Sequence, residues 1–123
     1  MIQMKPLDPA FPIQQQLAKE VSGPVVLVNV FTLSAADEAA FLDAWGKDAI
    51  FMKARPGFIS TQLHRAVGES PTYFNHAVWE SLELFRTAFS DPGFRARLAD
   101  YPLSATASPH VFQRVAVRGI CVA

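Results

Sequence analysis

Hydrophobic residues recur along this chain with two alternating periods, one typical of strands and one of helices. The run Val25–Leu33 is β-branched and almost continuously apolar, which predicts a strand buried on both faces. Three further strands are predicted, over Phe58–Ala66, Thr72–Glu80 and Val111–Val117. Residues 67–71 then form a hairpin loop, and residues 104–109 form a loop that leads into the last strand.

Between these strands the apolar spacing lengthens to that of an α-helix. The first helix follows Ser34 and carries one stripe, made of Phe41, Trp45, Asp48 and Met52. A carboxylate in the middle of such a stripe is unusual, and we interpret Asp48 as one partner of a salt bridge at an interface. The second helix begins after Ser81, restarts at Pro92, and continues its stripe through Phe85, Phe89, Phe94, Leu98 and Tyr101.

The order of elements, β-α-β-β-α-β, predicts an α+β domain of ferredoxin-like topology. Right-handed crossovers place the first and third strands at the centre of an antiparallel sheet, with helices on one face. The second strand then pairs with the third, and the fourth with the first. Because the first strand is apolar on both faces, the uncovered face is expected to meet the sheet of a second copy. We therefore predict a homodimer.

The chain divides into three segments by composition. Residues 1–23 contain Pro6, Pro9 and Pro12 and predict an irregular arm with a short helix. Residues 24–118 hold the ferredoxin-like domain, and residues 119–123 form an apolar tail.

Composition narrows the possible partners and the compartment. Half of the 123 residues are hydrophobic, and 11 basic residues balance 11 acidic ones. No basic block alternates with aromatic residues, so we expect no nucleic-acid partner. The single cysteine, Cys121, cannot form an internal disulfide and favours a reducing compartment. Residues 1–12 do not resemble a signal peptide and no apolar run could span a bilayer, so a cytoplasmic protein without membrane contact is expected.

Hairpin geometry predicts a cluster of polar side chains. If the loop is symmetric about Glu69 and Ser70, His64 lies opposite Asn75, and Trp79 projects from the same face. Three hydrogen-bonding groups in an apolar layer need partners, which a polar aromatic ligand would supply. Arg97 lies at the edge of the second helical stripe and is the cation that we expect beside this cleft.

The chain resembles the antibiotic biosynthesis monooxygenase family in residues 56–60, in His64 and in the segment Asn75–Ser81. The resemblance covers roughly residues 24–118 and implies a dimeric α/β barrel of ferredoxin-like subunits.

It also implies a reaction, in which O₂ oxidises a small aromatic or polyketide-like phenol without any cofactor or metal. In that reaction His64 would act as base or hydrogen-bond relay, and Asn75 and Trp79 would hold the developing oxyanion. Arg97 would steer an anionic group of the substrate. A tyrosine that such relatives use at the substrate falls at Phe85 here, so a low rate on a model anthrone is expected.

Two alternatives remain open at this stage. One is a non-catalytic barrel that binds a small aromatic molecule or has a structural role. The other is the haem-degrading branch of the family, for which Asn29 and Trp79 match residues at the substrate. That branch also needs an axial histidine on the second helix, and no histidine occurs between Trp79 and Pro109.

Overall fold

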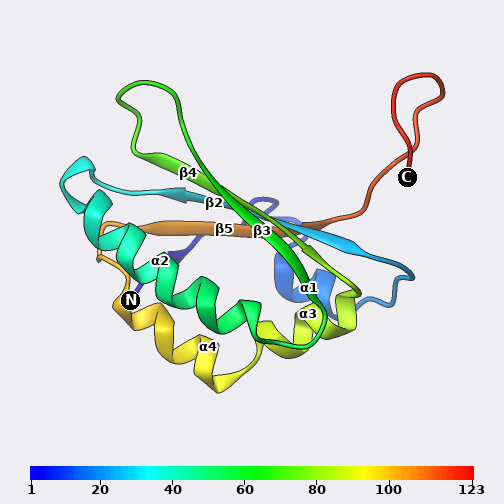
Figure 1. Cartoon of the computed structure of the whole chain (residues 1–123), viewed down its shortest axis with the longest axis horizontal. Coiled ribbons are helices and arrows are strands. Elements are labelled where there is room, and N and C mark those ends of the chain that lie inside the picture. The colour runs from blue at the N-terminus through cyan, green and yellow to red at the C-terminus, as the bar shows by residue number, and fades with distance from the viewer.

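The computed structural model describes all 123 residues as one open five-stranded sheet with helices on one side (Figure 1). The strands, in the sheet order β1-β5-β2-β4-β3, are β1 (Gln3–Met4), β5 (Thr106–Phe112), β2 (Val25–Thr32), β4 (Thr72–Trp79) and β3 (Phe58–Arg65). The helices are α1 (Ile13–Leu17), α2 (Glu38–Lys53), α3 (Leu82–Phe89) and α4 (Pro92–Arg97), with 3₁₀ turns at Ala35–Asp37 and Leu98–Asp100. None of these helices combines the length and apolar character that crossing a membrane requires.

This architecture confirms the predicted α+β, ferredoxin-like topology. β2 lies between β4 and β5 and pairs with both in antiparallel fashion, and β3 pairs with β4 as a hairpin. Side-chain capping explains where α3 and α4 begin. The Ser81 side chain accepts a hydrogen bond of 3.1 Å from the Leu84 N–H at the start of α3, and Asp91 accepts one of 2.7 Å from the Gly93 N–H at the start of α4.

The last strand begins and ends earlier in the chain than the sequence pattern predicts. β5 covers Thr106–Phe112, so the predicted loop over residues 104–109 and the strand over 111–117 are both wrong. Pro109 is tolerated inside β5 because its nitrogen points to the outer edge, where β1 no longer pairs. The Val111 N–H points to that same edge and donates a 2.9 Å hydrogen bond to Oε1 of Gln16 in α1.

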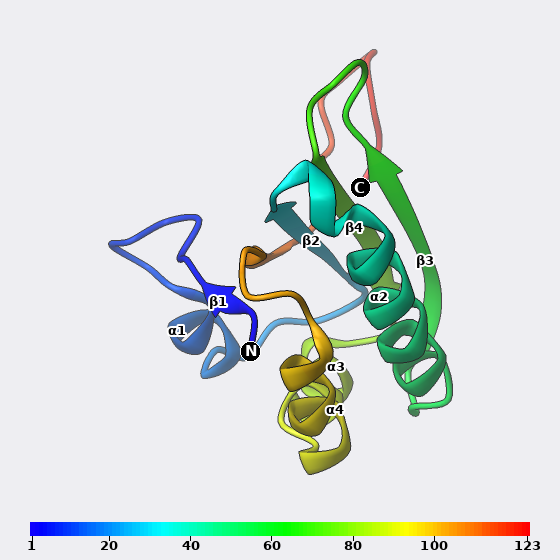
Figure 2. The same ribbon diagram turned by 90° about the vertical axis from the view of Figure 1, so that its left-hand side faces the viewer.

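The N-terminal arm adds a strand that the sequence pattern did not reveal. β1 pairs in parallel with Thr106 and Ala107 of β5, and α1 lies beside the next stretch of β5 (Figure 2). Gln16 accepts from the Val111 N–H and donates to the Val111 carbonyl, both at 2.9 Å. Since an unpaired edge invites association with other strands, the arm protects this side of the sheet.

The register of the β3–β4 hairpin differs from the predicted register by one residue. His64 pairs with Phe74, and Leu63 pairs with Asn75. The hairpin loop is centred on Glu69 alone, because Gly68 adopts a left-handed conformation with φ of 81° and the Ala66 N–H bonds to the Thr72 carbonyl. The prediction that His64 lies opposite Asn75 is therefore wrong.

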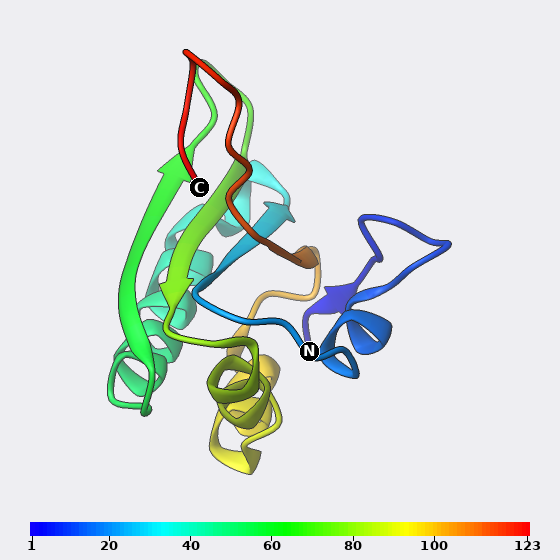
Figure 3. The same cartoon turned by 90° about the vertical axis from the view of Figure 1, so that its right-hand side faces the viewer.

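The two faces of the sheet have different surroundings. On the covered face, Val25, Leu27 and Phe31 of β2 are buried beneath the helices. On the open face, Val26, Val28 and Val30 are half-buried, and no helix lies over them (Figure 3). Beyond Phe112 the chain leaves the body and turns back on itself between Val117 and Cys121. In this chain β2 is thus fully buried on one face only, which differs from the predicted burial on both faces.

Candidate functional site

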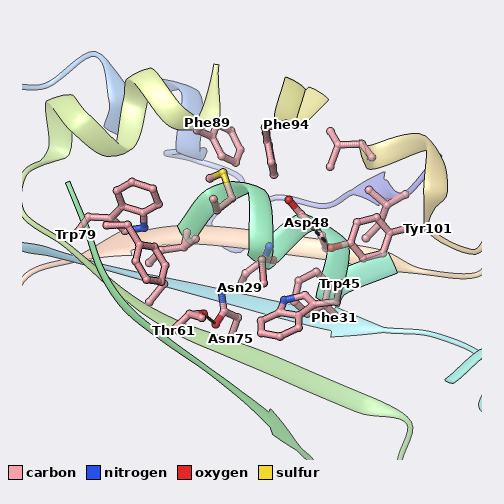
Figure 4. Close-up of a pocket in the computed structure, with 18 residues that line it drawn as sticks. Asn29, Phe31, Trp45, Asp48, Thr61, Asn75, Trp79, Phe89, Phe94 and Tyr101 are labelled. Carbon is pink, nitrogen blue, oxygen red and sulfur yellow. Dashed lines mark hydrogen bonds between the residues drawn. The ribbon is translucent and has the colours of Figure 1, made fainter. Parts of the chain in front are cut away.

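A cavity lies between the covered face of the sheet and the helices α2 and α4, and we call it the chamber (Figure 4). It is lined by 18 residues, of which 14 are hydrophobic. The centres of water-sized molecules can occupy about 60 Å³ of it, several times what a single water needs. The chamber is therefore small, and most of its wall is apolar.

Two asparagines enter the chamber from the middle of the sheet. Asn29 of β2 and Asn75 of β4 are direct cross-strand partners, so their side chains share the covered face. The hydroxyl of Thr61 on β3 donates to Oδ1 of Asn75 and fixes the orientation of that amide. Asn29 has no such anchor, and its buried Oδ1 has no hydrogen-bond partner.

Trp79 lines the chamber at the end of β4 and is 1% exposed. Its ring packs edge-on against Phe58 and Phe85, with centroids at 5.5 and 5.6 Å. The indole Nε1 is buried and has no partner. Leaving a buried donor unpaired costs roughly 1–3 kcal/mol, so this N–H is available to a ligand that presents an acceptor.

Asp48 enters the same space from the middle of α2 (Figure 4). The Tyr101 hydroxyl donates a 2.7 Å hydrogen bond to Oδ2 of Asp48, and Oδ1 is buried without a partner. Burial raises the pKa of this carboxyl to about 6, although the Tyr101 hydrogen bond and the charge of Arg97 oppose the rise. Asp48 forms no salt bridge and points into the chamber between α2 and the sheet, so its interpretation as an interfacial ion pair is wrong.

Three of the predicted site residues lie outside the chamber. His64 projects from the open face, where its ring stacks on Phe74 at 4.3 Å. The Arg97 guanidinium lies 4.4 Å from the centre of the Phe51 ring and donates to the Gly93 carbonyl. Phe85 is fully buried behind Trp79 and does not reach the cavity.

The structure thus brings together Asn29, Asn75 and Trp79 of the predicted set, and it adds Asp48 with Tyr101. From the sequence, Asp48 was interpreted as one partner of a salt bridge at an interface, and Tyr101 as part of the apolar stripe of the second helix. The sequence did contain a sign of this contact. Asp48 lies in the apolar stripe of one helix and Tyr101 in the apolar stripe of the other, and two such stripes meet in the interior. Nowhere in the chain do three or more His, Cys, Asp or Glu side chains gather in a way that could hold a metal ion.

Comparison with known proteins agrees with this fold. The model of a family described as antibiotic biosynthesis monooxygenase matches residues 24–99. Deoxynogalonate monooxygenase from Streptomyces nogalater is 36% identical over 70 residues, which is 57% of this chain and 58% of that protein. The alignment therefore spans little more than half the length of that relative.

Solved structures show the same fold over most of the chain. SnoaB, a cofactor-independent oxygenase from Streptomyces nogalater, superposes with a TM-score of 0.71 at 28% identity, covering 80% of this chain and 99% of its own. Rv0793 from Mycobacterium tuberculosis superposes with a TM-score of 0.66 at 13% identity, covering 78% of this chain and 99% of its own. At that identity, the likeness to Rv0793 concerns the fold alone.

Proposed function

Because this chain belongs to the antibiotic biosynthesis monooxygenase family, we propose that it is a cofactor-independent monooxygenase that reacts a small aromatic or polyketide-like phenol with O₂ in the chamber. The observation that carries this proposal is the unpaired indole N–H of Trp79, which faces an apolar cavity together with Asn29 and Asn75. The activities of deoxynogalonate monooxygenase and of SnoaB, a cofactor-independent oxygenase, support the reaction type.

The reaction that we propose needs no reductant. An activated ring CH₂ group, as in an anthrone, loses a proton to give an electron-rich anion. The anion transfers one electron to O₂, and the two radicals combine to form a carbon–oxygen bond. The resulting peroxide takes up a proton, loses the second C–H proton and expels water, leaving a carbonyl. One oxygen atom of O₂ enters the product and the other leaves as water, so CH₂ and O₂ become C=O and H₂O.

The chamber supplies what this chemistry requires. Negative charge develops on the substrate oxygen when the anion forms, and donors already in place there lower the barrier without reorganising. The Trp79 N–H is one such donor, and the Asn75 amide is another, with its oxygen already engaged by Thr61. The largely hydrophobic lining excludes water and so strengthens these interactions.

The shape of the chamber favours a planar ring system. Aromatic side chains form both of its ends. The ring of Tyr101 lies 6.4 Å from that of Phe31 at one end, and Trp79 packs against Phe58 at the other. Rigid aromatic walls suit a flat aromatic ligand, because offset and edge-on ring contacts are favourable.

We also propose that the enzyme works as a homodimer joined through the open face of the sheet. That face carries half-buried valines, and Phe74 and Ile59 on it are 38% and 51% exposed. Exposed apolar side chains on a sheet face that no helix covers mark an interaction site in a small protein, and a second copy is the partner that the sequence pattern of β2 favours.

The test is isotopic. The dialysed protein is incubated with 1,8-dihydroxyanthrone under ¹⁸O₂ in the absence of reductant, and the product and water are analysed by mass spectrometry. One labelled atom in each is expected. If the compound quenches the tryptophan fluorescence of the protein but no label enters the product, the chain is a binding protein and the monooxygenase proposal fails.

A further inference from the structure

Only two of the residues that line the chamber can titrate, and they are Asp48 and Tyr101. His64, the base that the family resemblance implies, lies on the other face of the sheet. The pKa of the Tyr101 hydroxyl is raised strongly by burial and by the charge of Asp48, so this group stays protonated. A base inside the chamber at neutral pH is therefore the carboxylate of Asp48.

The two oxygens of this carboxylate have different environments. Oδ2 accepts the 2.7 Å hydrogen bond from Tyr101, whereas Oδ1 is buried and has no partner. Asp48 as a whole is 9% exposed. A purely structural tether between α2 and the segment that holds Tyr101 would need one oxygen only. The second oxygen is left with its full capacity to accept a proton or a hydrogen bond from a bound molecule.

The carboxylate is also held firmly in place. The Tyr101 ring that anchors Oδ2 is itself packed against Phe31 and Phe41, at 6.4 and 5.7 Å between ring centres. Asp48 comes from the middle of α2, between Trp45 and Met52, which line the same cavity. A group fixed by its neighbours in this way keeps one direction toward a ligand, which is what proton transfer needs.

Few groups affect the ionisation of Asp48. Arg97 of α4 and the Tyr101 hydroxyl both favour the ionised form, and burial beneath the sheet opposes it more strongly. The strands that face Asp48 contribute only neutral side chains to the chamber. Its pKa of about 6 makes it a stronger base than an exposed aspartate, yet leaves it ionised at neutral pH.

We propose that Asp48 is the catalytic base of this chamber, and that its Oδ1 takes the proton from the substrate. The inference rests on the proposed oxygenation. The carboxylate removes one proton from the activated CH₂ group and becomes a carboxylic acid, while the electron pair stays on the substrate as the anion. After O₂ adds, the acid returns this proton to the terminal peroxide oxygen. The carboxylate then removes the second C–H proton as the O–O bond breaks, and that proton leaves with the hydroxide as water.

Two variants distinguish a catalytic base from a purely structural tether. If Asp48 is only a tether, Asp48→Asn should keep the activity and Tyr101→Phe should lose it; if Asp48 is the base, the reverse is expected. Asp48→Asn keeps an oxygen that can accept from Tyr101 but is no longer basic. Tyr101→Phe removes the tether and keeps the base. Asp43→Asn is the matched control, because Asp43 lies on the same helix with its side chain 70% exposed and paired with Lys47 on the surface.

The experiment separates proton transfer from oxygenation. Each protein is mixed with 1,8-dihydroxyanthrone without O₂ at pH 7, and the absorbance band of the substrate anion is recorded. Oxygen uptake is then measured from pH 5 to 8. The wild type and Asp43→Asn are expected to form the anion, and their kcat/KM is expected to rise through about pH 6 as Asp48 ionises. Asp48→Asn is expected to form none and to lose roughly 10²–10⁴-fold in kcat. Tyr101→Phe should still form the anion, with its pH profile moved upward.

Two results would overturn the proposal. One is a wild-type protein that gives no anion without O₂. The other is an Asp48→Asn variant, folded by near-ultraviolet circular dichroism, that forms the anion and retains the wild-type pH profile. If the wild type forms the anion but consumes no O₂, the base assignment stands and the monooxygenase proposal fails, so the two failures are distinguishable.

Discussion

Asn29 and Asn75 lie directly opposite each other on the neighbouring strands β2 and β4, and both side chains enter the chamber. Asparagine is depleted in strand interiors, so a facing pair at the centre of a sheet is unusual. The two amides are held differently, since Thr61 fixes Asn75 while Oδ1 of Asn29 is unpaired. This arrangement gives the chamber one fixed donor and one free acceptor beside the indole of Trp79.

The first prediction concerns Asn75. Replacing it by alanine removes a donor that acts on charge developing in the transition state, so kcat for oxygen uptake should fall roughly 10²–10³-fold. Stability should fall less, by about 1–2 kcal/mol, because one hydrogen bond to Thr61 is lost. Oxygen-electrode kinetics and urea unfolding measure the two effects separately.

The control for this prediction is Asp43→Ala. The Asp43 side chain is 70% exposed on α2, outside the chamber and away from the open face of the sheet, so its replacement should leave oxygen uptake within about twofold of the wild type, as expected for a residue that touches neither substrate nor catalytic group. Equal losses in both variants would mean that the chamber is not where the reaction takes place.

The hairpin shows which part of this site the sequence could predict. Apolar spacing located both strands, and the alternation along β4 correctly placed Asn75 and Trp79 on one face. The register was wrong by one residue, because it depends on whether the loop has an odd or even length. Gly68, with φ of 81°, allows the odd loop, and Arg65 stabilises it by donating to the Gly68 carbonyl at 2.8 Å. A one-residue slip moves a side chain to the other face, and this slip removed His64 from the site.

Asp48 shows a second limit of what the sequence can predict. Its place on the inner stripe of α2 was predicted correctly. Whether an inward-facing carboxylate meets a salt-bridge partner, a hydroxyl or an open cavity depends on how two helices and a sheet pack, and helical spacing contains no such information. The contact with Tyr101 joins residues 53 positions apart.

The second prediction concerns pH and stability. The pKa of Asp48 is about 6 in the folded chain against an ordinary value of 3.8, so between these values the folded state keeps a proton that the unfolded state releases. The free energy of unfolding should therefore decrease as pH rises from about 4 to about 6 and then level off, by about 3 kcal/mol from this group.

Urea unfolding at several pH values tests this sign. The wild type and Asp43→Asn should both show the decrease that Asp48→Asn lacks, so the difference between wild type and Asp48→Asn isolates the group. A difference that stays constant from pH 4 to 7 would show that Asp48 has an ordinary pKa.

The third prediction concerns assembly. Val28 lies at the centre of the open face, with His76 and His110 as its cross-strand neighbours. Val28→Lys should place a charge in the dimer interface and convert the protein from a dimer to a monomer of 13.5 kDa. Light scattering measures the mass, and Ile50→Lys, at a helical position that is 73% exposed, is the control. A wild type that is already monomeric would contradict the proposed homodimer.

The fourth prediction concerns the N-terminal arm. Ile2 is 4% exposed, lines the chamber, and donates from its N–H to the Leu98 carbonyl at 3.1 Å. Ile2→Ala should lower the free energy of unfolding by about 2–3 kcal/mol and leave a larger cavity. Met4→Ala, at a position that is 39% exposed, should cost far less. Equal unfolding midpoints for both variants in urea would show that the arm is not part of the core.

Stoichiometric oxygen uptake shows directly whether this chamber oxygenates a planar phenol without a cofactor. Dialysed wild type, treated with a chelator and given no reductant, is mixed with 1,8-dihydroxyanthrone in an oxygen electrode beside Asn75→Ala. We expect the wild type to consume one O₂ for each anthraquinone formed, well above the uncatalysed background, and Asn75→Ala to be far slower. Uptake at the background rate by both proteins would contradict the monooxygenase proposal.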